Sequence, residues 1–219
     1  YIMPRFCANI NDIVVSFTHV PKCGGTSVKT MMLEAEGLDW HNEVSKDWGI
    51  PEKERNYKDS YRGQATRFYK LHDENFYDRV HYRICMIRDP IERLKSAYTN
   101  RVLYHGKGSV PGGWEEFVLR LGTYNNGDLT HHTLPMYREL GESSNRFDKV
   151  FTINEMDKVA KFLSKISGRD VQPIKRQTGG SEHKDKIKLT ENDINTIKFY
   201  YRQDYKYWWN KDVVPQAFI

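Results

Sequence analysis

The sequence predicts an α/β fold, a parallel β-sheet flanked by helices in a phosphate-loop type of arrangement. Apolar runs typical of buried strands alternate with segments whose apolar residues recur at helical spacing. The 219 residues are enough for one substantial core, so we expect a single domain over residues 1–219. No stretch approaches the roughly 18 apolar residues of a membrane-spanning helix, so we expect no membrane partner.

The first half of the chain is expected to hold two strand–helix pairs. Residues 13–20 (IVVSFTHV) form a β-branched and aromatic run that indicates a buried strand. Residues 26–36 follow with one apolar stripe, which predicts a helix. Residues 37–79 are polar and irregular, as is typical of a functional surface region or of a partly disordered segment. Residues 80–87 (VHYRICMI) indicate the second strand.

The second strand leads into the best-marked helix start of the chain. Asp89 can cap the helix, Pro90 suits its first position and Glu92 can close a capping box. A glycine-rich loop is expected over residues 104–113. Further helices are expected over residues 114–121 and 129–140.

The last third of the chain repeats the strand–helix order. Residues 149–153 indicate a short strand, and Asn154 is expected to cap the helix after it. Residues 168–189 form a basic connection, and Thr190 is expected to open the last helix.

Charge and cysteine content limit the function classes only loosely. The net charge of +5 suggests an anionic partner, for which nucleic acid, a phosphorylated nucleotide and an acidic polysaccharide all qualify. The three cysteines form no even-numbered disulfide framework, which favours a reducing compartment. Cys23 could be a reactive thiol near a positive helix end, although a loop residue selected for its small size explains it better.

The segment after the first strand has the chemistry of a phosphate-binding loop. Adjacent glycines let the backbone approach a ligand closely, and the next helix offers unpaired N–H groups. A lysine adds a full charge and two hydroxyls add donors. Because the lysine precedes the glycines, the loop differs from the G-x-x-x-x-G-K-[ST] motif of nucleoside triphosphatases. The residues concerned are Lys22, Cys23, Gly24, Gly25, Thr26 and Ser27.

The segment after the second strand supplies a second candidate phosphate site. Arg88 leaves the strand end, where ligands collect in parallel sheets, and its guanidinium can bind a phosphate with two donors. Ser96 lies two helical turns on from Arg88, so its hydroxyl could face the same anion. Arg93 could serve there too, or it could form an ordinary surface ion pair with Glu92 or Asp89.

These two segments resemble the sulfotransferases that use 3′-phosphoadenylyl sulfate (PAPS), most closely the carbohydrate-type group (sulfotransferase family 2). HVPKCGGTS at 19–27 is similar to the loop for the 5′-phosphosulfate, and IRDPIERLKSAY at 87–98 is similar to the 3′-phosphate motif. The similarity extends over most of the chain but is dense only there. It implies a sulfotransferase that moves the sulfuryl group of PAPS to an acceptor hydroxyl, leaving 3′-phosphoadenosine 5′-phosphate.

The resemblance assigns roles to individual positions. Lys22, Gly24, Gly25, Thr26 and Ser27 would hold the 5′-phosphosulfate, with Lys22 stabilising the leaving oxygen. Arg88 and Ser96 would hold the 3′-phosphate. A loose match places Gly180 and Ser181, beside Gly179, in a further loop near the nucleotide. No metal is implied, and no convincing metal-ligand spacing is found.

The catalytic base is where the sequence departs from the family pattern. Related enzymes have a histidine in a stretch similar to residues 61–71, but Gln64 stands at the most similar position here. His72 is the first candidate for the base and Glu34, on the first predicted helix, is the second. The other candidates are also histidines: His19, His131 and His132.

The acceptor and the rival functions remain open at this level. Family resemblance favours a carbohydrate hydroxyl, which the polar segment 37–79 and the loop 104–113, with Trp114 beside it, could bind. A peptide tyrosine or a small alcohol is also compatible. A nucleotide or small-molecule kinase would need a different glycine–lysine order and an acidic magnesium ligand. A nucleic-acid-binding module would need a continuous basic stripe, whereas acidic residues interrupt the one basic concentration, at 175–188.

Localisation follows from weak signals only. The odd cysteine count and the lack of a hydrophobic anchor favour a cytoplasmic protein. The alternative is the Golgi lumen, with an N-terminal anchor removed before Tyr1.

Overall fold

The computed structural model describes residues 5–38, 80–107, 110, 112–125, 127–174, 180, 183 and 187–209. The chain divides into two compact units. Unit 1 comprises Tyr1–His19, Gly25–Cys85 and Phe147–Lys175. Unit 2 comprises Val20–Gly24, Met86–Arg146 and Arg176–Ile219.

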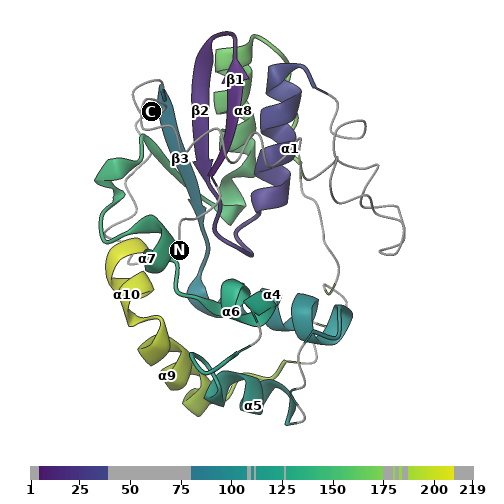
Figure 1. Ribbon diagram of the computed structural model, residues 1–219, viewed down its shortest axis with the longest axis vertical. Coiled ribbons are helices and arrows are strands. Elements are labelled where there is room, and N and C mark those ends of the chain that lie inside the picture. The colour runs from purple at the N-terminus through teal and green to yellow at the C-terminus, as the bar shows by residue number, and fades with distance from the viewer. Residues whose placement is uncertain are drawn as a thin grey trace. The chain divides into compact units, whose positions relative to one another are not determined.

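The fold is α/β, as predicted, with a mostly parallel four-stranded sheet flanked by helices. The strands are ordered β1-β2-β3-β4 (Figure 1). The sheet is made by β1 (Arg5–Ile10), β2 (Ile13–Thr18), β3 (Tyr82–Ile87) and β4 (Lys149–Thr152); the helical elements of unit 1 are α1 (Gly25–Glu36), η6 (Ile153–Glu155) and α8 (Met156–Ser167). Helix α1 packs against β1 and α8.

Strand β1 was not predicted, and it makes one edge of the sheet antiparallel. It pairs with β2 from Arg5 opposite Thr18 to Ile10 opposite Ile13. The turn between them consists of Asn11 and Asp12, both with positive φ (49° and 65°). Two such residues between apolar runs are a recognised hairpin signal, because Asn and Asp tolerate the left-handed conformation. Strands β2 and β3 are parallel, as expected.

The cap of the α8 region also differs from the prediction. Thr152, rather than Asn154, is the capping residue, because the 3-10 turn η6 precedes α8. The Glu155 carboxylate accepts the Thr152 backbone N–H at 2.8 Å and completes a capping box. Asn154 lies within that turn.

Unit 2 is helical. Its elements are α4 (Pro90–Ala97), η4 (Tyr98–Tyr104), α5 (Gly113–Leu119), α6 (Gly127–Thr133), α7 (Tyr137–Leu140), η5 (Ser144–Arg146), α9 (Glu191–Tyr200), α10 (Arg202–Asp204) and η8 (Tyr205–Trp209). Helix α4 packs against α6 and α9, and α5 packs against α9. Thr190 caps α9 with a capping box through Asp193, which confirms the predicted start of the last helix.

The core of unit 2 is rich in aromatic side chains. Trp114 belongs to it and is only 7% exposed, with its ring edge-on to Tyr98 at 5.4 Å between centroids. Trp114 is therefore not available as a sugar-stacking platform, whereas Tyr104 in the neighbouring segment is 53% exposed. The buried cluster contains Leu94, Tyr98, Trp114, Phe117, Val118, Leu129, Ile187, Ile197 and Tyr201.

The helix predicted over residues 129–140 is two helices. Pro135 separates α6 from α7 because proline lacks the N–H that would continue the helical ladder. The buried Asp204 carboxylate replaces the missing partners at the break, accepting the backbone N–H groups of Met136 at 2.8 Å and Tyr137 at 2.9 Å.

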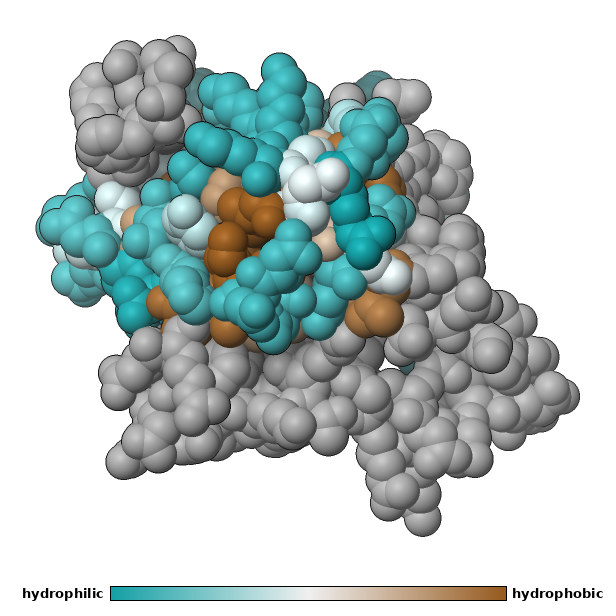
Figure 2. Space-filling view, turned by 90° about the horizontal axis from the view of Figure 1, so that it is seen from above, coloured by the Kyte–Doolittle hydropathy of each residue, from teal (hydrophilic) through white to brown (hydrophobic). Residues whose placement is uncertain are grey.

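The described surface is largely polar. In the view of Figure 2, most of the described surface is hydrophilic and a smaller area is apolar. None of the helices among the described residues is long and apolar enough to cross a membrane.

Candidate functional site

The predicted phosphate loop makes a tight turn in unit 2. Cys23 donates its backbone N–H to the Val20 carbonyl at 3.3 Å. Lys22 has a φ of 66° and Gly24 a φ of 78°, so two residues of this short turn are in the left-handed region. Such a backbone is unusual for a lysine and indicates a position that the surrounding structure imposes.

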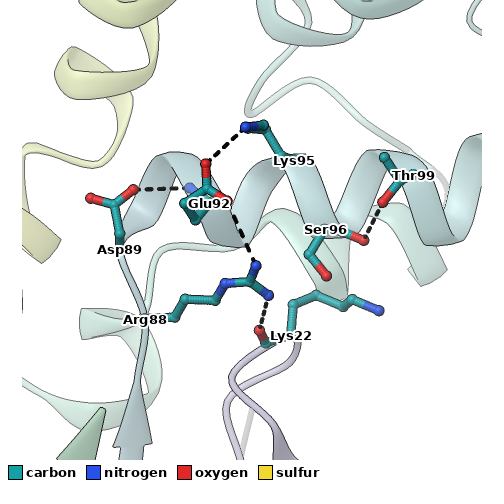
Figure 3. A network of polar contacts seen from close by, with 7 residues as sticks. All are labelled: Lys22, Arg88, Asp89, Glu92, Lys95, Ser96 and Thr99. Carbon is teal, nitrogen blue, oxygen red and sulfur yellow. Dashed lines mark hydrogen bonds and ion pairs between the residues drawn. The ribbon is translucent and has the colours of Figure 1, made fainter. Parts of the chain in front are cut away.

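Arg88 binds this turn directly. Its Nη1 atom donates to the Lys22 carbonyl at 3.2 Å, and its Nη2 atom lies 3.9 Å from Glu92 (Figure 3). Asp89 caps α4 by accepting the Glu92 N–H at 2.9 Å, as predicted. The Glu92 carboxylate also accepts a hydrogen bond from Lys95 Nζ at 2.8 Å, so it interacts with both Lys95 and Arg88. The sequence-predicted residues Lys22 and Arg88 are thus brought together.

Ser96 lies on the same helix as these cap residues. Its side chain projects from α4 on the side that faces Lys22 and Arg88 (Figure 3). Its carbonyl accepts the Thr99 hydroxyl at 3.5 Å. The hydroxyl of Ser96 therefore faces the basic residues of the loop, as its helical spacing from Arg88 predicted.

The ammonium group of Lys22 lies among other charges. Burial, together with the positive charges of Arg101 and Arg88, lowers the pKa of Lys22 to about 8, whereas Asp128 opposes this shift. Lys22 Nζ donates to Asn100 Oδ1 at 2.8 Å. Burial also lowers the pKa of Arg88, although a guanidinium stays charged. Three cationic side chains therefore influence one another here.

Sequence reasoning missed Arg101 and Asn100. Both belong to η4, a π-helix that continues α4 without a sequence signal of its own. Arg101 Nε lies 3.6 Å from Asp128 Oδ2, and the other carboxylate oxygen lies 3.7 Å from His132 Nε2. Asp128 therefore holds Arg101 in place from α6.

Arg93 is not a surface residue, so the interpretation as an exposed ion pair was wrong. It is fully buried, with its guanidinium 5.3 Å from the Tyr201 ring centroid. Nη1 donates to the carbonyls of Pro21 and His132, each at 3.4 Å, and Nη2 donates to the carbonyl of Leu134. Arg93 thereby connects α4 to the residue preceding Lys22 and to the end of α6.

Cys23 is buried within the turn. Its Sγ atom lies 3.9 Å from Met136 Sδ. Burial raises the pKa of the Cys23 thiol to about 12, so the group is a neutral thiol at physiological pH. This environment favours the interpretation of Cys23 as a small buried residue.

The other predicted donor-binding residues are placed unevenly. Gly25, Thr26 and Ser27 open α1, which belongs to unit 1 and follows Gly24 directly in the chain. A side chain at Gly25 would collide with the His19 ring unless that ring moved. Gly180 is in unit 2 with a φ of 85°, and an added Cβ would lie 2.6 Å from the Thr99 carbonyl oxygen. Ser181 lies outside the described residues.

The candidate bases fall in different parts of the chain. His72 and Gln64 lie outside the described residues. Glu34 is on α1 in unit 1. His19, which follows β2, also belongs to unit 1 and lies beside Gly25. His131 and His132 are on α6 in unit 2, where burial lowers the pKa of His131. The described residues contain no group of three or more His, Cys, Asp or Glu that could hold a metal ion.

The arrangement in unit 2 is suited to binding an anion. An ammonium and two guanidiniums raise one another's electrostatic energy, and a phosphate or sulfate would relieve that repulsion.

A family model described as the sulfotransferase family matches residues 9–208. The chain belongs to the sulfotransferase family. The match covers the candidate loop, the Arg88 segment and the closing helices.

Membership of the sulfotransferase family defines the general class of reaction. This sulfotransferase is an enzyme that transfers a sulfuryl group to an acceptor hydroxyl. Comparison with curated proteins and with solved structures gave no significant match.

Proposed function

We propose that this sulfotransferase takes the sulfuryl group from PAPS and transfers it in line to a carbohydrate hydroxyl. The observation that carries the proposal is the cluster of Lys22, Arg88 and Arg101 in unit 2, where burial and the two guanidiniums lower the pKa of the lysine. PAPS carries phosphate groups at both ends of its ribose and a terminal sulfate, so it offers the anions that such a cluster lacks.

The residues present fit the donor. Arg88 and Ser96 are placed on one side of α4 and would hold the 3′-phosphate, the guanidinium with charge and the hydroxyl with a donor (Figure 3). Lys22 would bind the 5′-phosphosulfate. Gly25, Thr26 and Ser27, which follow it in the sequence, are assigned to the same group from the sequence alone. The close approach of Gly180 to the backbone of Thr99 supports a role for its loop near the nucleotide. Ser181 is assigned there from the sequence alone.

The chemical step needs little from the protein beyond placement and charge. The acceptor oxygen forms a bond to sulfur while the bond from sulfur to the bridging phosphate oxygen breaks. The electron pair of that bond stays on the phosphate of the product, 3′-phosphoadenosine 5′-phosphate. The Lys22 ammonium stabilises the negative charge on that oxygen. The proton of the acceptor hydroxyl passes to a base, for which we propose His72 first and Glu34 second.

A carbohydrate acceptor is supported by the resemblance of residues 19–27 and 87–98 to the carbohydrate-type group. The exposed Tyr104, whose ring is edge-on to His105 at 4.8 Å, offers an apolar face of the kind that sugars stack on. A peptide tyrosine or a small alcohol would be the outcome to consider if no glycan reacts.

The donor assignment is tested by thermal unfolding with 3′,5′-adenosine diphosphate in the absence of magnesium. The melting temperature of the wild-type protein should rise, and Arg88→Ala should lose most of that rise. Arg138→Ala is the matched control because Arg138 is an exposed residue of the same unit. A rise seen only with ATP and magnesium would replace the proposal with a kinase. A screen of glycans and small alcohols with labelled PAPS then identifies the acceptor.

A further inference from the structure

Asn100 is a buried residue of η4 that makes a side-chain hydrogen bond to the central lysine of the site. It is 2% exposed, and its Oδ1 atom accepts from Lys22 Nζ at 2.8 Å. The two residues are 78 positions apart in the chain, so tertiary structure alone brings them together. No motif in the sequence singles Asn100 out.

The π-helix explains why Asn100 faces Lys22. Helix α4 ends at Ala97, and from Tyr98 the chain continues as η4. The Asn100 carbonyl accepts from the N–H of His105, five residues on, at 3.1 Å. An i→i+5 pattern holds more residues in each turn, so side chains of η4 point in directions that a continuing α-helix would not give them. π-Helical segments are rare and occur frequently at functional sites.

The backbone of Asn100 is also fixed from outside the helix. An added Cβ on Gly180 would lie 2.6 Å from the Thr99 carbonyl oxygen and 2.9 Å from the Asn100 nitrogen. The Gly180 backbone therefore packs directly on this part of η4. At the other end of the contact, Arg88 holds the Lys22 carbonyl at 3.2 Å. Both partners of the hydrogen bond are thus held by their main chains.

We propose that Asn100 is the positioning residue of Lys22: its amide oxygen fixes the direction of the ammonium and favours its protonated form while leaving its positive charge available to an anion. The catalytic meaning of this rests on the proposed function, but the effect on Lys22 does not. A carboxylate at the same place would hold the ammonium as well, but it would neutralise it and repel a phosphosulfate.

The charges around Lys22 show why a neutral acceptor is needed. Burial disfavours the ammonium most, and Arg101 on η4 and Arg88, just before α4, disfavour it as well. Asp128 on α6 favours it, and the adjacent Cys23 thiol is neutral; His105, at the end of η4, is near enough to be affected by Lys22. With a pKa of about 8, Lys22 is close to losing its proton near neutral pH. A hydrogen bond that prefers the charged form counteracts this.

The test measures the pKa of Lys22 directly, by NMR of the ¹³C-dimethylated protein without donor or acceptor. Burial lowers the pKa of both Lys22 and Lys29 to about 8, so the Lys22 signal is assigned by its loss in Lys22→Arg. Asn100→Asp, which keeps the size and shape of the side chain, should raise the Lys22 pKa by about one pKa unit or more. Asn100→Ala should lower it. Asn195→Asp, the same change at an exposed position of α9, should leave it unchanged.

A second measurement separates positioning from a purely structural role. At neutral pH, Asn100→Asp should bind 3′,5′-adenosine diphosphate about tenfold more weakly or worse, although its lysine is more fully protonated. Loosened packing alone is not expected to raise the Lys22 pKa and at the same time weaken the binding of the bisphosphate. Folded Asn100→Asp protein with an unchanged Lys22 pKa overturns the proposal, and this holds even if Asn100→Ala does not fold.

The result is independent of the donor assignment. If wild-type protein does not bind the bisphosphate at all, the proposed function fails, and the pKa series of Asn100 variants still decides whether Asn100 governs Lys22. If the bisphosphate binds and both the pKa and the affinity are insensitive to Asn100, the donor assignment stands and the positioning role is refuted.

Discussion

Replacing Arg93 with methionine should destabilise the fold strongly. The guanidinium is fully buried and donates to the carbonyls of Pro21, His132 and Leu134. Methionine fills a similar volume, so the main effect is electrostatic rather than a cavity. The change also removes the positive charge that lowers the pKa of Asp204 against the effect of its burial.

The magnitude follows from these contacts. Two of the three hydrogen bonds are long, at 3.4 Å, and count for less than a well-formed bond to a charged donor. Leaving buried partners without a cation costs about 3–5 kcal/mol in unfolding free energy. For a chain of this size that corresponds to a fall in melting temperature of about 10 °C. Arg93→Lys should recover only part of it, because an ammonium cannot reproduce the planar fork of donors.

Urea unfolding of the ligand-free protein, followed by circular dichroism, measures the effect. Arg138→Met is the matched control, since Arg138 is exposed on α7 and lies over the Tyr137 ring. The control should change the unfolding free energy by less than about 1 kcal/mol. An equally small change in Arg93→Met would refute the view that this guanidinium joins α4 to the phosphate loop.

The remaining predictions concern the site. Because an anion prefers the ammonium, bisphosphate affinity measured by calorimetry should fall as the pH rises through about 8, the pKa of Lys22 in the free protein; Lys22→Arg should remove this dependence. His72→Ala should sharply reduce turnover of labelled PAPS and leave bisphosphate affinity intact, and undiminished turnover would pass the role of base to Glu34. Gly180→Ala should lower the melting temperature more than Gly106→Ala, because both have positive φ but only Gly180 meets the η4 backbone; equal losses would mean that φ alone matters.

The parts of the fold that sequence reasoning predicted are those that depend on neighbouring residues. Asp89 and Thr190 cap their helices as expected, since a cap is a contact between residues three apart. The proximity of Lys22 and Arg88 was predicted because each follows one of two parallel strands, β2 and β3. A short-range rule combined with a simple topology was sufficient in these places.

Some predictions of strand and helix boundaries were wrong although the sequence contains a local signal, because a competing pattern was given more weight. The Asn11-Asp12 pair marks the β1–β2 hairpin, although β1 itself is a short segment at the beginning of the chain. Pro135 marks the break between α6 and α7, but the apolar spacing continues across it. Thr152 competes with Asn154 as a cap, and Glu155 three residues after Thr152 decides between them.

Other features had no local signal at all. Nothing in the sequence distinguishes η4 from a continuing α-helix, so Asn100 and Arg101 could not be assigned to the site. Arg93 looks like a surface residue because an arginine is expected on the polar face of a helix. Its burial depends on carbonyl groups of Pro21 and of the α6 end, which are brought to it only by tertiary folding.

The left-handed backbone of Lys22 has an evolutionary consequence. An L-residue with a side chain loses roughly 1–2 kcal/mol in that conformation relative to glycine. In a laboratory selection for heat resistance alone, glycine at position 22 should therefore be enriched. The same substitution should disappear when survivors must also transfer sulfate, because the ammonium would be gone. With the role proposed above for Lys22, the strained turn is retained for catalysis at a cost in stability.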